Sequence, residues 1–212
     1  MALPYQTPFV DGFWNREWRV NGVWNDTLRE VARAAGGQWQ ISPEAYPNPG
    51  DTQGLMADLL VQQIVPDPLL AGRSNLSVPI VLYEGKGRPA IGGADWVAVR
   101  EQLELWCYRQ HANNPDPIWV IGVIGNGIKF WMYSSRSIQY DHPVNPTNSC
   151  LVPFEWNLAG GAPAWNWNAL GNTADTGASY GYARAEIALM LQFIFAHPLA
   201  AGMAPPAAGL AW

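Results

Sequence analysis

An acid and a lysine stand two residues apart at the end of the apolar segment Val78–Gly87, which reads VPIVLYEGKG. Side chains at positions i and i+2 of a β-strand point to the same face. If this segment is a strand, Glu84 and Lys86 therefore lie side by side at its carboxyl end. Charges that end a buried strand need a partner, because an unpaired charge is costly to desolvate. The pair is accordingly either a structural ion pair or part of a site that uses both charges.

A second acid stands at the start of another apolar run. Asp58 is followed by Leu59–Val65, which periodicity alone allows as helix or strand, and Pro66–Pro68 ends the run. If both runs are extended, they form an antiparallel pair with a long connection, and the start of the first strand lies beside the end of the second. Asp58 is then expected close to Glu84 and Lys86.

Three segments have the periodicity or the capping residues of helices. The first is expected over about Asp26–Ala35, where apolar residues recur at helical spacing and Gly36–Gly37 follows as a C-cap. The second is expected over about Asp95–His111, with its apolar residues on one stripe. The third, over about Ser179–Ala196, is largely apolar and is expected to pack on the body of the domain.

Further strands complete the predicted elements. Gln38–Ile41 favours a short strand, and Ile118–Ile124 and Ile128–Ser134 flank a tight Gly125–Gly127 turn that predicts a β-hairpin. The order is therefore helix, strands, helix, strands. That order predicts an α/β domain with a mixed β-sheet.

The length of 212 residues fits one domain with a sizeable core. Within it we expect an N-terminal arm over residues 1–24, a core over residues 25–135, and a tryptophan-rich loop region, C-terminal helix and tail over residues 136–212. The net charge of −5 gives no general attraction to nucleic acid, so a phosphate-binding surface would have to be local.

The ends of the chain and its cysteines bear on where it functions. The sequence begins without the basic and apolar regions of a signal peptide, and its longest apolar stretch, Ile187–Ala196, is too short to span a bilayer. These features predict an intracellular protein with no membrane segment. Cys107 and Cys150 lack metal-ligand spacing; two buried thiols are expected, and a disulfide stays open as an alternative.

This pattern of elements and charges resembles the PD-(D/E)xK nuclease superfamily, which has the restriction-endonuclease-like fold. Ala57–Asp58 stands for the first motif, with alanine in place of proline, and Glu84–Lys86 stands for the second. The glycine in the middle of the second motif, Gly85, departs from the usual apolar residue and indicates a bulge or a close backbone approach. Pro66–Asp67 is a second candidate for the first motif, although it follows the strand. The resemblance covers about residues 25–135 and implies a mixed sheet with an α-β-β-β-α-β core, an added hairpin and a C-terminal helix.

Two helical residues extend the resemblance. Glu30 on the first helix matches an acid that many members carry there. Gln102 on the second helix resembles the glutamine of a Q-x-x-x-Y motif, although Trp106 stands in the tyrosine position. Of the 12 basic residues only Lys86 and Lys129 are lysines, so a lysine stands where the motif requires one.

The resemblance implies a Mg²⁺- or Mn²⁺-dependent nuclease that acts on DNA or RNA. Asp58, Glu84, the Gly85 carbonyl and Glu30 would hold the metal. Lys86 would position or deprotonate the attacking water, and Gln102 would orient a water or contact the nucleic acid. Clustered carboxylates without metal are expected to have raised pKa values. The choice between DNA and RNA, cleavage at ends or in the interior, and a homo-oligomeric state all stay open.

Two other classes of function compete with this interpretation. The first is a non-catalytic binding or assembly module of the same fold, which the acidic net charge and the sparse lysines favour. The second is an α/β-hydrolase, because Gly177–Gly181 reads GASYG and matches G-x-S-x-G. A polar loop precedes Ser179, so we interpret that motif as an N-cap or turn. The stretch Trp156–Trp167 could stack on bases or sugars, but packing is the favoured explanation.

Overall fold

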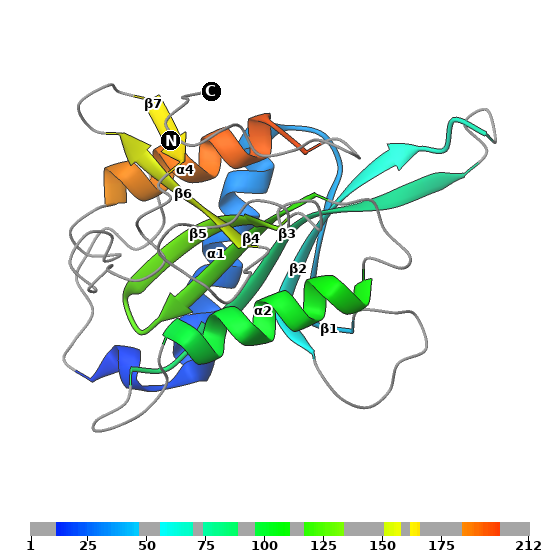
Figure 1. Cartoon of the computed structure of the whole chain (residues 1–212). Coiled ribbons are helices and arrows are strands. Elements are labelled where there is room, and N and C mark those ends of the chain that lie inside the picture. The colour runs from blue at the N-terminus through cyan, green and yellow to red at the C-terminus, as the bar shows by residue number, and fades with distance from the viewer. Residues whose placement is uncertain are drawn as a thin grey trace.

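In the computed structural model, a seven-stranded mixed β-sheet lies between helices on its two faces (Figure 1). The structure describes residues 12–46, 56–69, 74–88, 96–110, 117–133, 151–157, 162–165 and 184–199. Its helical elements are η1 (Phe13–Asn15), α1 (Glu17–Ala35), α2 (Trp96–Gln110) and α4 (Arg184–Ala196). Its strands are β1 (Trp39–Ala45), β2 (Ala57–Pro66), β3 (Asn75–Lys86), β4 (Ile118–Ile124), β5 (Gly127–Tyr133), β6 (Leu151–Asn157) and β7 (Ala162–Trp165).

The strands lie in the sheet in their order along the chain. Every neighbouring pair is antiparallel except β3 and β4, which are parallel. A parallel pair needs a crossover connection, and α2 lies in that connection. The element order α1-β1-β2-β3-α2-β4 confirms the expected helix, three strands, helix and strand. The β4–β5 hairpin is also confirmed, with Gly125 at a φ of 60° in its turn.

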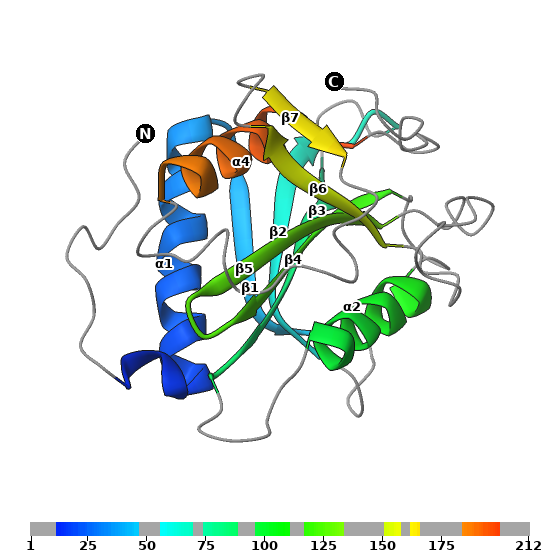
Figure 2. The same cartoon turned by 60° about the vertical axis from the view of Figure 1, so that its left-hand side comes forward.

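Two apolar layers hold the helices on the sheet. Helices α1 and α4 cover one face and α2 covers the other, as Figure 2 shows. Successive residues of β3 alternate between the layers: Val81 and Tyr83 pack in the layer under α1, and Leu82 packs in the layer under α2. This alternation sets the faces on which the charged residues at the end of β3 lie.

The first helix is longer than the sequence predicted. It begins at Glu17 instead of Asp26, so the part of the expected 1–24 arm that follows Arg16 is helical. The apolar spacing continues upstream through Val20, Val23 and Trp24, all of which are buried. The polar residues Asn25, Asp26 and Thr27, whose types suit an N-cap, lie inside the helix instead, and the Thr27 hydroxyl donates to the carbonyl of Val23 at 2.7 Å. Threonine can make this bond inside a helix as well as cap a helix, so its position in the sequence does not by itself mark where a helix begins.

The region after residue 135 also departs from its prediction. Strands β6 and β7 extend the sheet where turns and loops were expected, and helix α4 begins at Arg184. The strand β6 still packs into the core, since Phe154 stacks 4.7 Å from the ring of Trp119. Gly177–Gly181, with Ser179, and Cys150 lie outside the described residues, whereas Cys107 is buried under α2. Among the described helices, none combines the length and the apolar character that crossing a membrane requires.

The contact between α2 and the sheet generates a prediction for Gly122 in β4. A Cβ atom at Gly122 would lie 2.8 Å from Cζ3 of Trp131 and 2.9 Å from Cγ1 of Val99. Both neighbours are buried and packed, so we expect Gly122→Ala to lower the free energy of unfolding by about 1–3 kcal/mol. Urea denaturation followed by circular dichroism measures the change.

Gly22→Ala is the matched control for this substitution. A Cβ atom at Gly22, on the exposed side of α1, meets no atom within 4 Å. Alanine should therefore raise the free energy of unfolding by about 0.5–1 kcal/mol, because glycine is a poor helix former. A wild-type unfolding curve for Gly122→Ala would show that α2 does not press on the sheet at this position.

Candidate functional site

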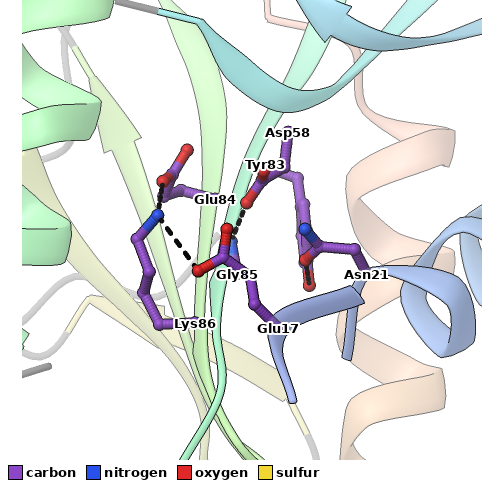
Figure 3. A network of polar contacts seen from close by, with 7 residues as sticks. All are labelled: Glu17, Asn21, Asp58, Tyr83, Glu84, Gly85 and Lys86. Carbon is purple, nitrogen blue, oxygen red and sulfur yellow. Dashed lines mark hydrogen bonds and ion pairs between the residues drawn. The ribbon is translucent and has the colours of Figure 1, made fainter. Parts of the chain in front are cut away.

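A polar network lies where α1, β2 and the end of β3 meet (Figure 3). Helix α1 contributes two residues, β2 contributes one and β3 contributes four consecutive residues. They are Glu17, Asn21, Asp58, Tyr83, Glu84, Gly85 and Lys86. The network thus joins segments of the chain that are far apart in the sequence.

Glu84 and Lys86 form an ion pair at the carboxyl end of β3. The Lys86 Nζ atom lies 2.7 Å from Oε1 of Glu84, which confirms that the two side chains share a face of the strand. The Glu84 side chain is only 2% exposed and that of Lys86 is 26% exposed. In the parallel ladder Glu84 stands opposite Gly122 and Lys86 stands opposite Ile124, so the neighbouring strand offers no second charge.

Asp58 reaches the same strand end from β2. Leu59 pairs with Tyr83 in the antiparallel ladder, and one step further this register sets Asp58 opposite Glu84. The Asp58 Oδ2 atom accepts a hydrogen bond from the backbone N–H of Gly85 at 2.7 Å. The start of β2 therefore lies beside the end of β3, as the sequence predicted.

Gly85 is a point of close approach between α1 and the strand. A Cβ atom there would overlap both the Asn21 amide oxygen and the Tyr83 hydroxyl. Those two groups are bonded to each other, since Tyr83 donates to Oδ1 of Asn21 at 3.2 Å. Glycine in the middle of the E-x-K motif thus reflects a close approach, one of the two explanations given by the sequence.

Glu17 is a site residue that the sequence analysis missed. Its Oε2 atom lies 3.6 Å from Nζ of Lys86, so the lysine has carboxylates on two sides. The end of β3 is held against the start of α1 at Gly87, where a Cβ atom would lie 2.6 Å from the carbonyl oxygen of Asn15. The signal was available, because the apolar spacing of the helix extends upstream to Val20 and places Glu17 in the first turn.

Glu30, expected as a metal ligand, is not brought to this site. It forms an ion pair with Arg33 on a partly exposed side of α1. It lies thirteen residues after Glu17, which is about 20 Å along a helix. The expectation failed because the helix was placed too late in the sequence; the acid of α1 that meets Lys86 is Glu17.

Asp67, the second candidate for the first motif acid, also lies elsewhere. Its carboxylate accepts hydrogen bonds from the N–H of Leu69 at 2.8 Å and from the hydroxyl of Ser74 at 3.3 Å. These bonds lie at the far end of β2, about 30 Å along the strand from Asp58. Asp58 is therefore the acid that accompanies Glu84. Gln102 lies midway along α2, half-buried, and is not part of the network in Figure 3.

Burial raises the pKa values of both acids at the strand ends, and a neighbouring carboxylate adds to the shift, Glu17 for Asp58 and Asp58 for Glu84. Loss of water raises the pKa of Asp58, and the hydrogen bond from Gly85 offsets part of that effect. For Glu84, burial and then the charge of Asp58 raise the pKa to about 7, although the Lys86 ammonium opposes the shift. This confirms the expectation for clustered carboxylates in the absence of a cation.

Lys86 stays protonated in this arrangement. Burial by itself lowers its pKa, but the hydrogen bond that Lys86 donates to Glu84 and the charges of Glu84, Glu17 and Asp58 outweigh burial and raise the pKa above its ordinary value. A lysine with a raised pKa is a poor general base at neutral pH. Of the two roles expected for Lys86, the geometry therefore favours positioning and charge compensation over deprotonation of water.

The donor set of the network fits a magnesium-like cation. Within the described ranges no three Asp, Glu, His or Cys side chains converge closely enough to form a ligand group by themselves. Mg²⁺, however, commonly uses one or two carboxylates and keeps waters in its remaining positions. Asp58 and Glu84 supply two carboxylates, whose pKa values are raised first by burial and further by a neighbouring acid, and a bound cation would offset both effects.

The raised pKa of Glu84 generates a prediction about pH. Its value of about 7 exceeds the ordinary 4.5, so the protonated acid stabilises the fold at low pH and that contribution is lost as pH rises through 7. Glu84→Gln keeps a neutral side chain of similar shape at every pH. The stability of the variant relative to the wild type should therefore increase between pH 5 and pH 8, by on the order of 1–3 kcal/mol.

Urea denaturation without metal at the two pH values measures this change. Glu30→Gln is the matched control, because it removes an acid whose partner, Arg33, is on the surface. For the control we expect a difference of less than about 0.5 kcal/mol between the two pH values. If the free energies of unfolding of Glu84→Gln and wild type changed equally between the two pH values, Glu84 would have an ordinary pKa in the folded protein, which would contradict the prediction.

Comparisons with protein-family models, with curated proteins and with solved structures found no match for this chain. The chemistry of the protein is therefore inferred from its own residues: a buried acid and lysine at the end of β3, with a second acid on β2 and a third on α1.

Proposed function

We propose that this protein is a metal-dependent nuclease that hydrolyses phosphodiester bonds at Asp58, Glu84 and Lys86. The observation that carries the proposal is the convergence of the buried Glu84–Lys86 pair with Asp58 at adjoining strand ends. The order α1-β1-β2-β3-α2-β4, with its parallel β3–β4 pair, supports a restriction-endonuclease-like core. A structural ion pair alone would not require a second carboxylate beside it, which raises the pKa of Glu84.

Different residues of the chain would bind the metal ion and stabilise the charge that develops in such a reaction. A Mg²⁺ or Mn²⁺ ion held by Asp58, Glu84 and the Gly85 carbonyl would lower the pKa of a bound water and polarise the scissile phosphate. The Lys86 ammonium offsets charge that develops on the phosphate oxygens and orients the attacking water. Glu84 fixes the ammonium at 2.7 Å, and Glu17 limits its movement from the side of α1.

Asp58 and Gly85 keep the second carboxylate in place. The bond from the Gly85 N–H directs one oxygen of Asp58 toward β3. A hydrogen bond with the Asn21 side chain also favours the ionised form of Asp58. Preorganised groups of this kind avoid reorganisation during the reaction, which is a main source of rate enhancement. Gln102, which the resemblance placed in the site, has no assigned role in this arrangement.

The first test is cleavage of single- and double-stranded DNA and RNA with Mg²⁺ or Mn²⁺, comparing wild type with Glu84→Ala. We expect metal-dependent cleavage by wild type and a loss of at least about a hundredfold in the variant, because a metal ligand and the partner of Lys86 are both removed. Isothermal calorimetry should show metal binding by wild type and weaker binding by Glu84→Ala.

The absence of both cleavage and metal binding in the wild type would favour a different function. The net charge of −5 is a specific observation in favour of a non-catalytic module, because proteins that cleave nucleic acid usually present a basic groove. The same network would then be a structural ion-pair cluster on a nuclease-like scaffold.

The two lysines of the chain provide a matched pair of substitutions. Lys86 lies between Glu84 and Glu17, where the broad guanidinium of arginine cannot replace a compact ammonium. Lys129 instead lies 4.4 Å from the ring centroid of Trp96, a contact that arginine can also make. We expect Lys86→Arg to lower kcat by about a hundredfold or more and Lys129→Arg to change it by less than about twofold.

Cleavage assays at saturating substrate distinguish these outcomes, with circular dichroism to verify that both variants are folded. Wild-type activity in Lys86→Arg would show that a positive charge is sufficient and that the shape of lysine has no role. An equal loss in both variants would indicate a general effect of arginine on the fold.

A further inference from the structure

An exposed tryptophan follows the site residue Glu17 in the first turn of α1. This residue, Trp18, is 69% exposed, the highest value among the tryptophans whose side chains the structure describes. Trp24, one and a half turns later, is fully buried. An exposed indole gives up the large favourable free energy of burying its ring. Its exposure next to charged site residues indicates a binding surface.

The indole of Trp18 belongs to a small aromatic and cationic cluster. The Arg19 guanidinium carbon lies 5.0 Å from the ring centroid of Trp18 and 5.3 Å from that of Phe13. One cation therefore contacts two rings, which restrains Arg19 and places a positive charge over one face of the indole, so that the other face is the one on which a base could stack. We call Phe13, Trp18 and Arg19 the stacking platform.

Backbone contacts connect the stacking platform to the catalytic strand. The Arg88 N–H donates to the carbonyl of Trp14 at 2.7 Å, directly after β3 ends. Gly87 lies against Asn15, and Glu17 lies 3.6 Å from Lys86. Residues that precede Trp18 thus contact the site or the chain just after β3, and Asn21, which follows it, belongs to the site.

Several arginines belong to the chain segments around this part of an acidic protein. The chain has a net charge of −5, yet Arg16, Arg19 and Arg88 belong to the segments that meet here, and Arg16 and Arg88 are exposed. Lys86 is paired with Glu84 and Glu17, so the arginines are the cations of these segments that could contact a phosphate backbone. Proteins that bind single-stranded nucleic acid combine these two features: cations along the backbone and aromatic rings on which bases stack.

We infer that Trp18, restrained by Arg19, stacks on an unpaired base next to the scissile phosphate, so that the substrate is single-stranded nucleic acid or a single-stranded end. A base inside a duplex is already stacked on its neighbours and must first be flipped out, which costs a few kcal/mol. A single protruding indole therefore favours a strand whose bases are free. This inference rests on the proposed nuclease function for the position of the phosphate, but stacking itself does not require cleavage.

Binding measured without catalysis separates the two proposals. Fluorescence anisotropy follows a labelled oligo(dT), an oligo(rU) of equal length and a blunt DNA duplex, first in EDTA and then with Ca²⁺. We expect wild type to prefer single strands, and Trp18→Ala to weaken single-strand binding by about five- to a hundredfold, the range that stacking of one base spans. Trp18→Phe should recover most of the affinity, because it restores an aromatic face.

Tyr108→Ala is the matched control. Tyr108 is also 69% exposed, but it lies near the end of α2 that leads to the start of β4, whereas the site lies at the end of the parallel strand β3. Tyr108→Ala should leave the affinities for oligo(dT) and oligo(rU) within about twofold of wild type, since a ring remote from the site has no base to stack on. Comparison of the affinities for oligo(dT) and oligo(rU) shows whether the unpaired base comes from DNA or from RNA.

The outcomes of binding and cleavage are independent. Single-strand binding that depends on Trp18, without cleavage by any metal, would support the platform and overturn the nuclease proposal. Metal-dependent cleavage with unchanged binding by Trp18→Ala would overturn the platform and leave the nuclease proposal in place. Duplex binding as tight as single-strand binding, or no single-strand binding by wild type in either condition, would also overturn the platform.

Discussion

The burial of a charged group at the end of β3 is the constraint on which the site depends. Glu84 is almost completely buried, and moving a carboxylate out of water is costly unless partners compensate. The Lys86 ammonium offsets the charge of Glu84 from the same face of the strand. Glu17 adds a second negative charge beside Lys86, and Asp58 adds one beside Glu84. The network therefore has more acid than its single ammonium can neutralise, which is the electrostatic condition that suits a cation.

Close approaches between segments make this arrangement possible. At Gly85 the absence of a side chain leaves space for the Asn21 and Tyr83 groups, and at Gly87 the strand touches the start of α1. On the other face, Gly122 admits the packing of Val99 and Trp131 under α2. Protein interiors are close-packed, so these contacts hold the strand end between two helical layers with little freedom to move. The charged groups are consequently positioned by the packing of the whole domain.

The candidate site could be predicted in part because strand geometry is regular. The pairing of Glu84 with Lys86 follows from the two-residue repeat of a strand, and the arrival of Asp58 follows from antiparallel pairing. Glu30 was misplaced for a different reason. The polar residues near Thr27 have the chemistry of a helix cap, although Thr27 in fact bonds within α1. The helix was therefore expected to begin at Asp26, nine residues after its actual start at Glu17.

The alternation of apolar residues, the acid and lysine on one strand face, and the order of the helices and strands around them can all be read from the amino-acid sequence. Which distant acids join the pair depends on the tertiary structure. It brought Glu17 to Lys86 and set Asp67 at the far end of the hairpin, because strand register and helix packing fix distances that spacing in the sequence leaves open. The tertiary structure also decided the charge states, since the pKa of Glu84 depends on burial and on a neighbouring carboxylate from another strand.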